Sequence, residues 1–519
     1  MERSVSRESL RQAPDGERIQ LADDPAFDRS RATARPRWWL AVAALVWLVA
    51  FCVRLVPVLR GGGLTGASGL DPAVYYAAAA GWVRGRLPYQ DFLLLHPPGA
   101  PELLLPFALL ARVTSEPVGM AVARVVVMAM GATTAVVVAR ILRGSGAVSA
   151  LVGGLAYALF WPAIYVERST WLEGFGSFLT ALGMALVLGA SALARRSPRA
   201  ATVLAGVCLG FACTVKLWSA VVLLAVLAWH LAKRKWPDAG LLVLGALGAV
   251  TASLAPFLGV LPRLWEMTVV AQSGRLDLAR AGLLPRLGMV AGLPPTWSNP
   301  WLRAVAVVAV LLVAGRALSD RTGRFAALLF AASLMLLLVA PQFYRHYPAV
   351  VAAPLTVLLG LGAGRWLAQL RSHRLRVVIL VILAGVGAVA ALLAAHQRVD
   401  THFDGPGLAA VARTHPGCVT TDDPTALIAA DLIGSNLADG CRLVVDLTGY
   451  RYYLGGPADL RANPAWQEFY REYMSSGSLA VLTRKHAWDE MDDRTRALMR
   501  TWTTVGEVSG RPVLSPRPA

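Results

Sequence analysis

The sequence predicts an α-helical protein that crosses a membrane many times and carries a small α/β domain at its C-terminal end. Three observations predict this class: apolar runs of about 20 residues recur, basic clusters separate them, and the composition changes abruptly after residue 396. The chain has 519 residues, of which 56% are hydrophobic and 16% are charged. Its mean hydropathy of +0.53 exceeds that of an ordinary soluble domain.

The apolar runs predict about 11–13 transmembrane helices between residues 38 and 396. The candidate spans are 38–59, 117–139, 146–166, 170–194, 201–214, 216–232, 239–260, 301–316, 324–340, 348–365 and 376–396, with a shorter apolar piece at 100–113.

Charge is distributed unevenly along the chain. Residues 38–396 hold 29 basic and ten acidic residues, so the net charge of +18 comes from the apolar part. The basic residues sit between apolar runs, as cytoplasmic loop residues do under the positive-inside rule. Nucleic-acid binding needs a solvated basic face. We therefore expect the lipid bilayer, and no nucleic acid, as the partner of this part.

Placing each basic cluster in the cytoplasm fixes the expected topology from residue 140 onward. Near the start, either 100–113 does not cross fully or Arg140 and Arg143 face outward. Two crossings share residues 201–232, which places Lys216 near the outer surface. The segments expected outside, besides everything after residue 396, are 60–99, 167–173, 261–300 and 341–347.

The two ends of the chain differ from its middle. Residues 1–37 are polar and precede the first apolar run, which predicts a disordered cytoplasmic tail and not a signal peptide. Residues 397–519 predict a small extracytoplasmic α/β domain. Its expected elements are strands at 444–447 and 479–482 and helices at 424–433, 464–474 and 489–500. An outside location permits a Cys418–Cys441 disulfide, and two reduced core cysteines are the alternative.

The first outer loop, 60–99, carries the strongest catalytic candidate. Asp71 precedes Pro72, which suits the first position of a helix, so we expect an interfacial helix over 72–85 with Asp71 as its cap. A cap holds a carboxylate rigidly, so capping and catalysis are compatible roles for Asp71.

The same loop offers three candidate substrate-binding residues. Tyr75 follows Asp71 on the expected helix, and Asp91 and His96 lie near the end of the loop. A turn-stabilising role for Asp91 and a buried, hydrogen-bonded role for His96 are the structural alternatives.

Ionisable groups near the outer ends of later spans complete the candidate set, because charge in a membrane is costly. Glu173 begins a span beside Gly174 and is a catalytic candidate, whereas Glu167 beside Arg168 is interpreted as a solvated loop pair. Cations on the same side suit a phosphate. These substrate-binding candidates are Lys216, Arg345 and His346, with a snorkelling lysine as the alternative for Lys216.

The first outer loop resembles that of the GT-C glycosyltransferases that use polyprenyl-phosphate sugars. The matching features are an Asp at a helix start, Leu87-Pro88-Tyr89-Gln90-Asp91-Phe92, and His96-Pro97-Pro98-Gly99. This class includes protein mannosyltransferases, lipid A aminoarabinose transferases and actinobacterial cell-wall mannosyl- and arabinosyltransferases. The resemblance covers about residues 38–396, and the C-terminal part resembles the extracytoplasmic domains of the actinobacterial members.

The resemblance implies an inverting transfer from a polyprenyl-phosphate sugar, the donor substrate, to a glycan, lipid or protein acceptor. It implies that Asp71 is the general base and that Glu173 is a second acidic site residue. The chain departs from the family pattern in having a single Asp in the loop, and Glu173 matches by position only. Some relatives use a divalent metal and others do not, and no ligand cluster in the sequence decides between them.

Two other functions fit a multi-pass protein of the cell membrane. A transporter or flippase for a lipid-linked sugar is the main alternative, and a scaffold with a binding domain is another. Transporters tend to show internal repeats and polar groups at the membrane midplane. Here no clear repeat is visible, and the polar residues lie toward the span ends, which favours the enzyme.

Overall fold

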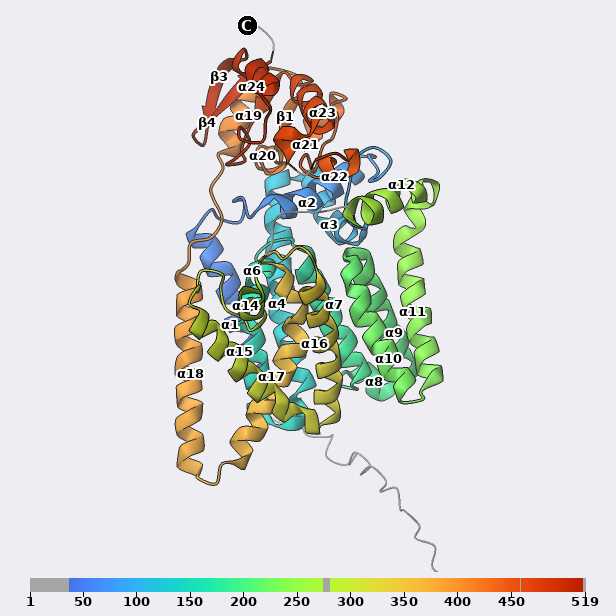
Figure 1. Cartoon of the computed structure of the whole chain (residues 1–519), viewed down its shortest axis with the longest axis vertical. Coiled ribbons are helices and arrows are strands. Elements are labelled where there is room, and N and C mark those ends of the chain that lie inside the picture. The colour runs from blue at the N-terminus through green and yellow to red at the C-terminus, as the bar shows by residue number, and fades with distance from the viewer. Residues whose placement is uncertain (1–36, 274–280, 458, 517–519) are drawn as a thin grey trace, which may run out of the picture.

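The computed structural model describes residues 37–273, 281–457 and 459–516. It shows a bundle of long helices with a smaller C-terminal region at one end (Figure 1). Among the described residues, nine helices are long and apolar enough to cross a membrane, or ten if one bent pair counts as a single span. Adding the shorter apolar helix Leu217–Ala232 reaches the lower end of the predicted range. The expected tail 1–37 lies almost wholly outside the described residues.

The predicted spans recur as helices with similar bounds. The long helices, the bent pair and the shorter apolar helix α10 are α1 (Arg37–Arg60), α4 (Glu116–Ile141), α5 (Ala147–Ala158) with α6 (Trp161–Glu167), α7 (Leu172–Val187), α9 (Pro198–Val215), α10 (Ala220–Ala232), α11 (Trp236–Leu254), α15 (Pro300–Gly315), α16 (Arg321–Val339), α17 (Ala352–Gln369) and α18 (His373–His396). The shorter helices between them are α2 (Leu70–Trp82), α3 (Gly99–Val113), α8 (Ala192–Arg196), α12 (Leu261–Trp265), α13 (Ala271–Ser273) and α14 (Leu283–Val290).

The two ends of the bundle carry different segments. Helices α2, α3 and α12 lie at the end that meets the C-terminal region, and α8 and the α17–α18 connection lie at the opposite end (Figure 1). Helix α3 is not among the candidate spans, which favours the alternative in which residues 100–113 do not cross. The second expected outer loop, 261–300, consists of short helices, although residues 274–280 lie outside the described part.

Helix α2 differs from its prediction in two respects. It begins at Leu70 with Gly69 as the N-cap residue, so Asp71 lies in the first turn and is not the cap. The helix is also not an interfacial one, because residues 72–81 are all buried. It contacts α3 on one side and helices of the C-terminal region on another. Its run of small alanines permits this close packing.

The C-terminal region is built on a four-stranded sheet of order β1-β2-β4-β3, in which only β1 and β2 are parallel. Its strands are β1 (Val419–Thr421), β2 (Leu479–Val481), β3 (Thr503–Val508) and β4 (Arg511–Ser515). Its helices are α19 (Gly405–Thr414), α20 (Thr425–Ala429), α21 (Ile433–Ala438), α22 (Tyr450–Leu454), α23 (Pro464–Ser475) and α24 (Asp493–Arg500).

One predicted strand of this region is confirmed and one is wrong. The stretch 479–482 forms β2, but 444–447 forms no strand. Val444, Val445 and Leu447 are nonetheless buried. A short apolar run predicts burial without specifying a pairing partner, and this run packs as an extended segment between two helices.

The C-terminal region docks on the bundle through an apolar core. A single hydrophobic cluster joins residues of α2 and α3 to residues of the sheet and of α23. The predicted Cys418–Cys441 disulfide is present, and it links the start of β1 to the residues after α21.

Two buried arginines organise the polar contacts of the bundle. Arg124 of α4 donates to the carbonyl oxygens of Gly63, Leu64, Gly66 and Arg168 and forms an ion pair with Asp400. Its side chain is fully buried. A guanidinium can be buried at tolerable cost only when its donors are satisfied. These contacts therefore specify how residues 63–66, Arg168 and Asp400 meet around α4.

The interpretation of Glu167 as part of a solvated loop pair is wrong, because its partner is Arg54 of α1. The Glu167 carboxylate is fully buried, pairs with Arg54 at 2.5 Å and accepts a hydrogen bond of 2.6 Å from Tyr157. It is therefore part of a buried ion pair and not of a solvated loop. Arg168, its sequence neighbour, points elsewhere, with its guanidinium 5.2 Å from the centre of the Tyr165 ring.

Replacing Arg124 by Met should destabilise the protein by about 3–5 kcal/mol, because Asp400 would stay buried without its cation. Thermal unfolding in detergent, followed by tryptophan fluorescence, would show a lowered midpoint. The exposed Arg374 of α18 supplies the control variant Arg374→Met. Equal midpoints for the two variants would contradict this role of Arg124.

The disulfide can be detected by counting the free thiols. Of five cysteines, Cys52, Cys208 and Cys213 are free. Denatured protein should therefore take up three alkyl groups without reductant and five with it, as measured by mass spectrometry. The variant Cys418→Ser should take up four under both conditions. Five groups on unreduced wild-type protein would show that the bond does not form.

Candidate active site

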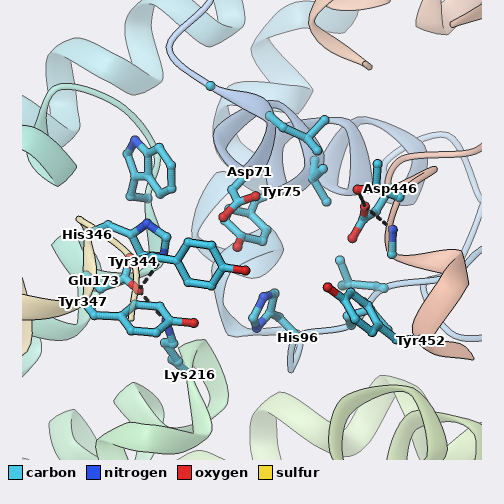
Figure 2. A pocket seen from close by; sticks show the side chains of 18 of the residues that line it. Asp71, Tyr75, His96, Glu173, Lys216, Tyr344, His346, Tyr347, Asp446 and Tyr452 are labelled. Atoms are coloured by element: carbon cyan, nitrogen blue, oxygen red, sulfur yellow. Dashed lines mark hydrogen bonds and ion pairs between the residues drawn. The ribbon is translucent and has the colours of Figure 1, made fainter. Parts of the chain in front are cut away.

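A cavity of about 360 Å³ lies where α2, the start of α7 and the C-terminal region meet. This size is within the range of small-molecule sites. Figure 2 shows Asp71 and Tyr75 of α2 in its centre, with Glu173 and Lys216 on one side and Asp446 and Tyr452 on the other.

The start of α2 is fastened to the loop that precedes α7. Ser68 and Ser169 share a hydroxyl hydrogen bond of 2.7 Å, and the Thr170 hydroxyl donates to the Pro72 carbonyl at 3.1 Å. Gly69 has a φ of 116°, and a Cβ there would lie 3.2 Å from the Trp171 ring. These contacts hold the Asp71 turn beside the helix that carries Glu173.

Glu173 and Lys216 form an ion pair inside the cavity wall. Their Oε1 and Nζ atoms are 2.5 Å apart, and the side chains are 5% and 13% exposed. The His346 Nε2 lies 3.8 Å from the same carboxylate oxygen. The lysine therefore does not merely snorkel to the surface, because it is matched to a specific carboxylate.

Local structure explains why Lys216 is at this position. Helix α9 ends at Val215 and a 3₁₀ turn, Leu217–Ser219, precedes α10. Lys216 lies at the break, with its ammonium 4.7 Å from the centre of the Trp218 ring and 4.4 Å from that of Tyr347. Aromatic faces attract a cation, so the two rings and Glu173 together hold the charge at the cavity.

The loop between α16 and α17 supplies the remaining cations. Arg345 lies with its guanidinium 5.6 Å from the centre of the Tyr165 ring, and both residues line the cavity. The His346 ring packs between those of Trp171 and Tyr344, at centroid distances of 4.7 and 5.6 Å. Three cationic or ionisable nitrogen groups thus gather at one end of the cavity.

His96 and Tyr75 form the floor near Asp71. Their rings meet edge to face with centroids 5.6 Å apart. The Tyr89 hydroxyl donates to the His96 carbonyl at 2.7 Å. Burial raises the pKa of Tyr89 well above its usual value, so this hydroxyl stays protonated and can keep His96 in place.

All the predicted site residues except Asp91 line the cavity. The Asp91 carboxylate instead accepts a hydrogen bond of 2.6 Å from the Leu87 amide, which is the turn-stabilising role left open by the sequence. The sequence did not reveal the aromatic residues Tyr165, Trp171, Tyr344 and Tyr347 as lining residues. It also missed the contribution of the C-terminal region, which consists of Asp446, Thr448, Gly449, Arg451 and Tyr452.

Potential metal ligands do not gather in threes or more among residues 37–273, 281–457 and 459–516.

Solved structures share this fold. ArnT from Cupriavidus metallidurans, in the form bound to undecaprenyl phosphate, matches with a TM-score of 0.59 and 16% identity over 93% of this chain and 98% of that one. The oligosaccharyltransferase of Archaeoglobus fulgidus matches with a TM-score of 0.55 and 14% identity over 86% of this chain and 70% of that one. No curated protein matches the sequence.

The fold is shared with multi-pass membrane proteins of the GT-C class, and the chain is a glycosyltransferase. More particularly, residues 94–341 match the family model of glycosyltransferase family 87. The matched range includes His96, Glu173 and Lys216.

The Glu173–Lys216 pair should show strong energetic coupling. Glu173→Gln and Lys216→Met should each destabilise the protein, and the double variant should be less destabilised than their sum by up to about 3 kcal/mol. Thermal unfolding of the four proteins measures the coupling.

The exposed pair Arg461–Asp493, at 3.2 Å with side chains 52% and 88% exposed, supplies the control cycle. Its coupling should stay below about 1 kcal/mol. Additive effects of Glu173→Gln and Lys216→Met would mean that the buried pair does not act as a unit.

Proposed function

We propose that the protein transfers a sugar from a polyprenyl-phosphate donor to an extracytoplasmic acceptor, with inversion and with Asp71 as general base. The observation that carries the proposal is the arrangement of the cavity, in which Asp71 faces the cations of Lys216 and Arg345 and the imidazole of His346. The similar ArnT structure is bound to undecaprenyl phosphate, which supports a lipid phosphate as the donor.

The proposed reaction is a single displacement. The Asp71 carboxylate takes the proton of an acceptor hydroxyl, and the acceptor oxygen attacks the anomeric carbon. As the new C–O bond forms, the bond between that carbon and the phosphate oxygen breaks. The polyprenyl phosphate leaves with the bonding pair, and its growing negative charge is stabilised by Lys216 and Arg345.

Glu173 has a positioning role in this proposal. Its carboxylate is paired with Lys216 at 2.5 Å and lies 3.8 Å from His346. It therefore aims the lysine and the imidazole at the phosphate. A bound phosphate would contact the Lys216 ammonium together with this carboxylate. The ammonium would therefore have an anionic partner both before and after the phosphate binds.

The orientation in the membrane follows from the same proposal. A cavity formed by the first outer loop and the C-terminal region would face outward at headgroup level, with residues 1–37 in the cytoplasm. The basic connections at α8 and between α17 and α18, at the far end of the bundle, would then be cytoplasmic, as the positive-inside rule requires.

Replacing Asp71 by Asn should lower transfer about 10²–10⁴-fold, the usual contribution of a general base. The assay uses purified protein, radiolabelled polyprenyl-phosphate mannose or arabinose, and a crude cell-envelope acceptor fraction. Binding of labelled polyprenyl phosphate and the thermal midpoint should both stay close to wild type, which separates catalysis from folding.

The matched control is Asp91→Asn, which changes an acidic residue of the same loop outside the cavity. Its transfer should remain close to that of wild type. If Asp71→Asn retained full transfer, the base would have to be another group, with Glu173 the first to test. If Asp91→Asn abolished transfer while folding normally, the assignment within the loop would be wrong.

A further inference from the structure

A second cavity, of about 280 Å³, adjoins the first. The two share His96, Lys216 and Tyr347 as lining residues. The other residues of the second cavity come from the end of the first outer loop, the break before α10, the second outer loop and the start of the α16–α17 loop. They are Pro97, Leu217, Trp218, Thr268, Gln272, Ser273, Ala340, Pro341 and Gln342. The C-terminal region lines only the first cavity.

The chemistry of the proposed donor indicates which parts of the two cavities hold the donor and which the acceptor. This inference rests on the proposed function. A polyprenyl phosphate needs a cation for its phosphate and an apolar exit for its chain. Lys216 lines both cavities, and the apolar residues Leu217, Trp218 and Pro341 line the second beside polar ones. The end of the first cavity farthest from Lys216 is then left for the acceptor.

That end of the first cavity is formed by one short stretch, residues 446–452. Asp446, Thr448, Gly449, Arg451 and Tyr452 all line it. Figure 2 shows Asp446 and Tyr452 on the side of α2 opposite Glu173 and Lys216. The Arg451 guanidinium stacks 4.5 Å from the centre of the Tyr452 ring, so a planar cation and an aromatic ring are presented together.

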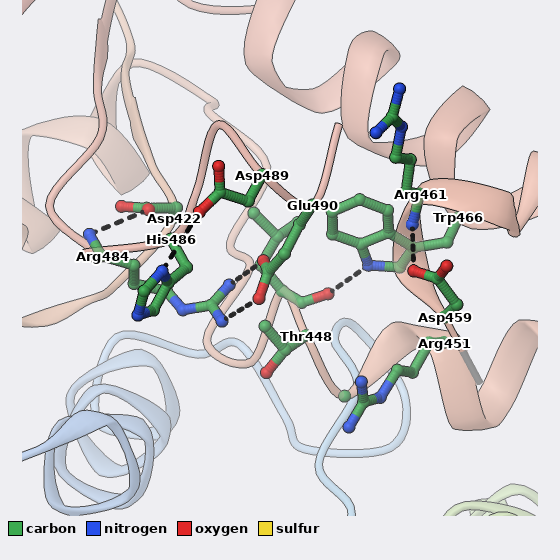
Figure 3. A network of polar contacts seen from close by, with 12 residues as sticks. Asp422, Thr448, Arg451, Asp459, Arg461, Trp466, Arg484, His486, Asp489 and Glu490 are labelled. Carbon is green, nitrogen blue, oxygen red and sulfur yellow. Dashed lines mark hydrogen bonds and ion pairs between the residues drawn. The ribbon is translucent and has the colours of Figure 1, made fainter. Parts of the chain in front are cut away.

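The stretch is held in place by its own turn and by the body of the C-terminal region. The Asp446 carboxylate accepts from the Gly449 amide at 2.7 Å and from the Thr448 hydroxyl at 3.1 Å. The Trp466 indole donates to the Leu447 carbonyl at 2.9 Å, in the network of Figure 3. A Cβ at Gly449 would lie 2.9 Å from Leu95 of the first outer loop. A binding surface held this firmly loses little entropy when a ligand binds.

We propose that Arg451 and Tyr452 form the acceptor subsite and that it accepts a saccharide. The C–H face of a sugar ring packs on aromatic rings, and Tyr75, Tyr344 and Tyr452 all line this cavity. The ring hydroxyls need donors and acceptors at fixed positions. The Arg451 guanidinium and the Tyr452 hydroxyl supply them, while Asp71 lies between this subsite and the donor cations.

The test compares Arg451→Ala and Tyr452→Leu with two other variants of the full chain. Tyr453→Leu changes a neighbour on α22 that lines neither cavity, and Lys216→Met changes the donor side. Transfer kinetics use polyprenyl-phosphate mannose or arabinose with short manno- or arabino-oligosaccharides as acceptors. Saturation-transfer NMR measures binding of the same oligosaccharides without donor.

Arg451→Ala should raise the KM for the oligosaccharide about 10- to 100-fold, as expected for the loss of a hydrogen bond involving a charged group, and Tyr452→Leu should raise it about 3- to 10-fold, as expected for a neutral one. Their donor KM should not change, Lys216→Met should raise the donor KM, and Tyr453→Leu should resemble wild type. An unchanged oligosaccharide KM in both subsite variants, or a raised donor KM in them, would overturn the inference. So would transfer to serine- or threonine-containing peptides but not to oligosaccharides.

If wild-type protein transferred no sugar to any acceptor, the proposed function would fail, and binding alone would decide the inference. Oligosaccharide signals that are present with wild type and lost in Arg451→Ala and Tyr452→Leu would support the subsite. Absence of oligosaccharide binding to wild type, or equal binding to the variants, would overturn it.

Discussion

The guanidinium of Arg124 is the contact on which the geometry of the cavity depends. It lies buried in α4 and binds three irregular segments at once: residues 63–66, Arg168 and Asp400. Each of these segments leads directly into a wall of the cavity. The first leads to Asp71, the second to Glu173, and the third to the C-terminal region. Because a buried cation must have all its donors satisfied, the three walls are positioned by a single set of hydrogen bonds.

The membrane is the reason that much of the site could be found from sequence. A bilayer penalises charge, so the few ionisable residues near span ends stand out against an apolar background. Asp71, Glu173, Lys216, Arg345 and His346 were visible in this way, and the structure brings them to one cavity. Long apolar runs predicted the helices for the same reason, since their length is set by the thickness of the bilayer.

Partners far apart in sequence could not be predicted. Glu167 was assigned to its neighbour Arg168, but its cation is Arg54, which is 113 residues away. The pairing of Glu173 with Lys216 spans 43 residues, and no local pattern contains it. Similarly, the largely apolar sequence of α2 suits a membrane interface as well as a protein interior. Packing against α3 and against α20 and α21 of the C-terminal region decides in favour of burial.

The walls of the cavity come from residues as early as Gly69 and as late as Tyr452. During synthesis the lining residues from Asp71 through His346 are made before the stretch 446–452. Contacts of such long sequence separation form late, because loop closure must precede them. A nascent or truncated chain can therefore contain the cations and the carboxylate but lacks the last wall. The cavity is thus enclosed only after the chain has been synthesised as far as Tyr452.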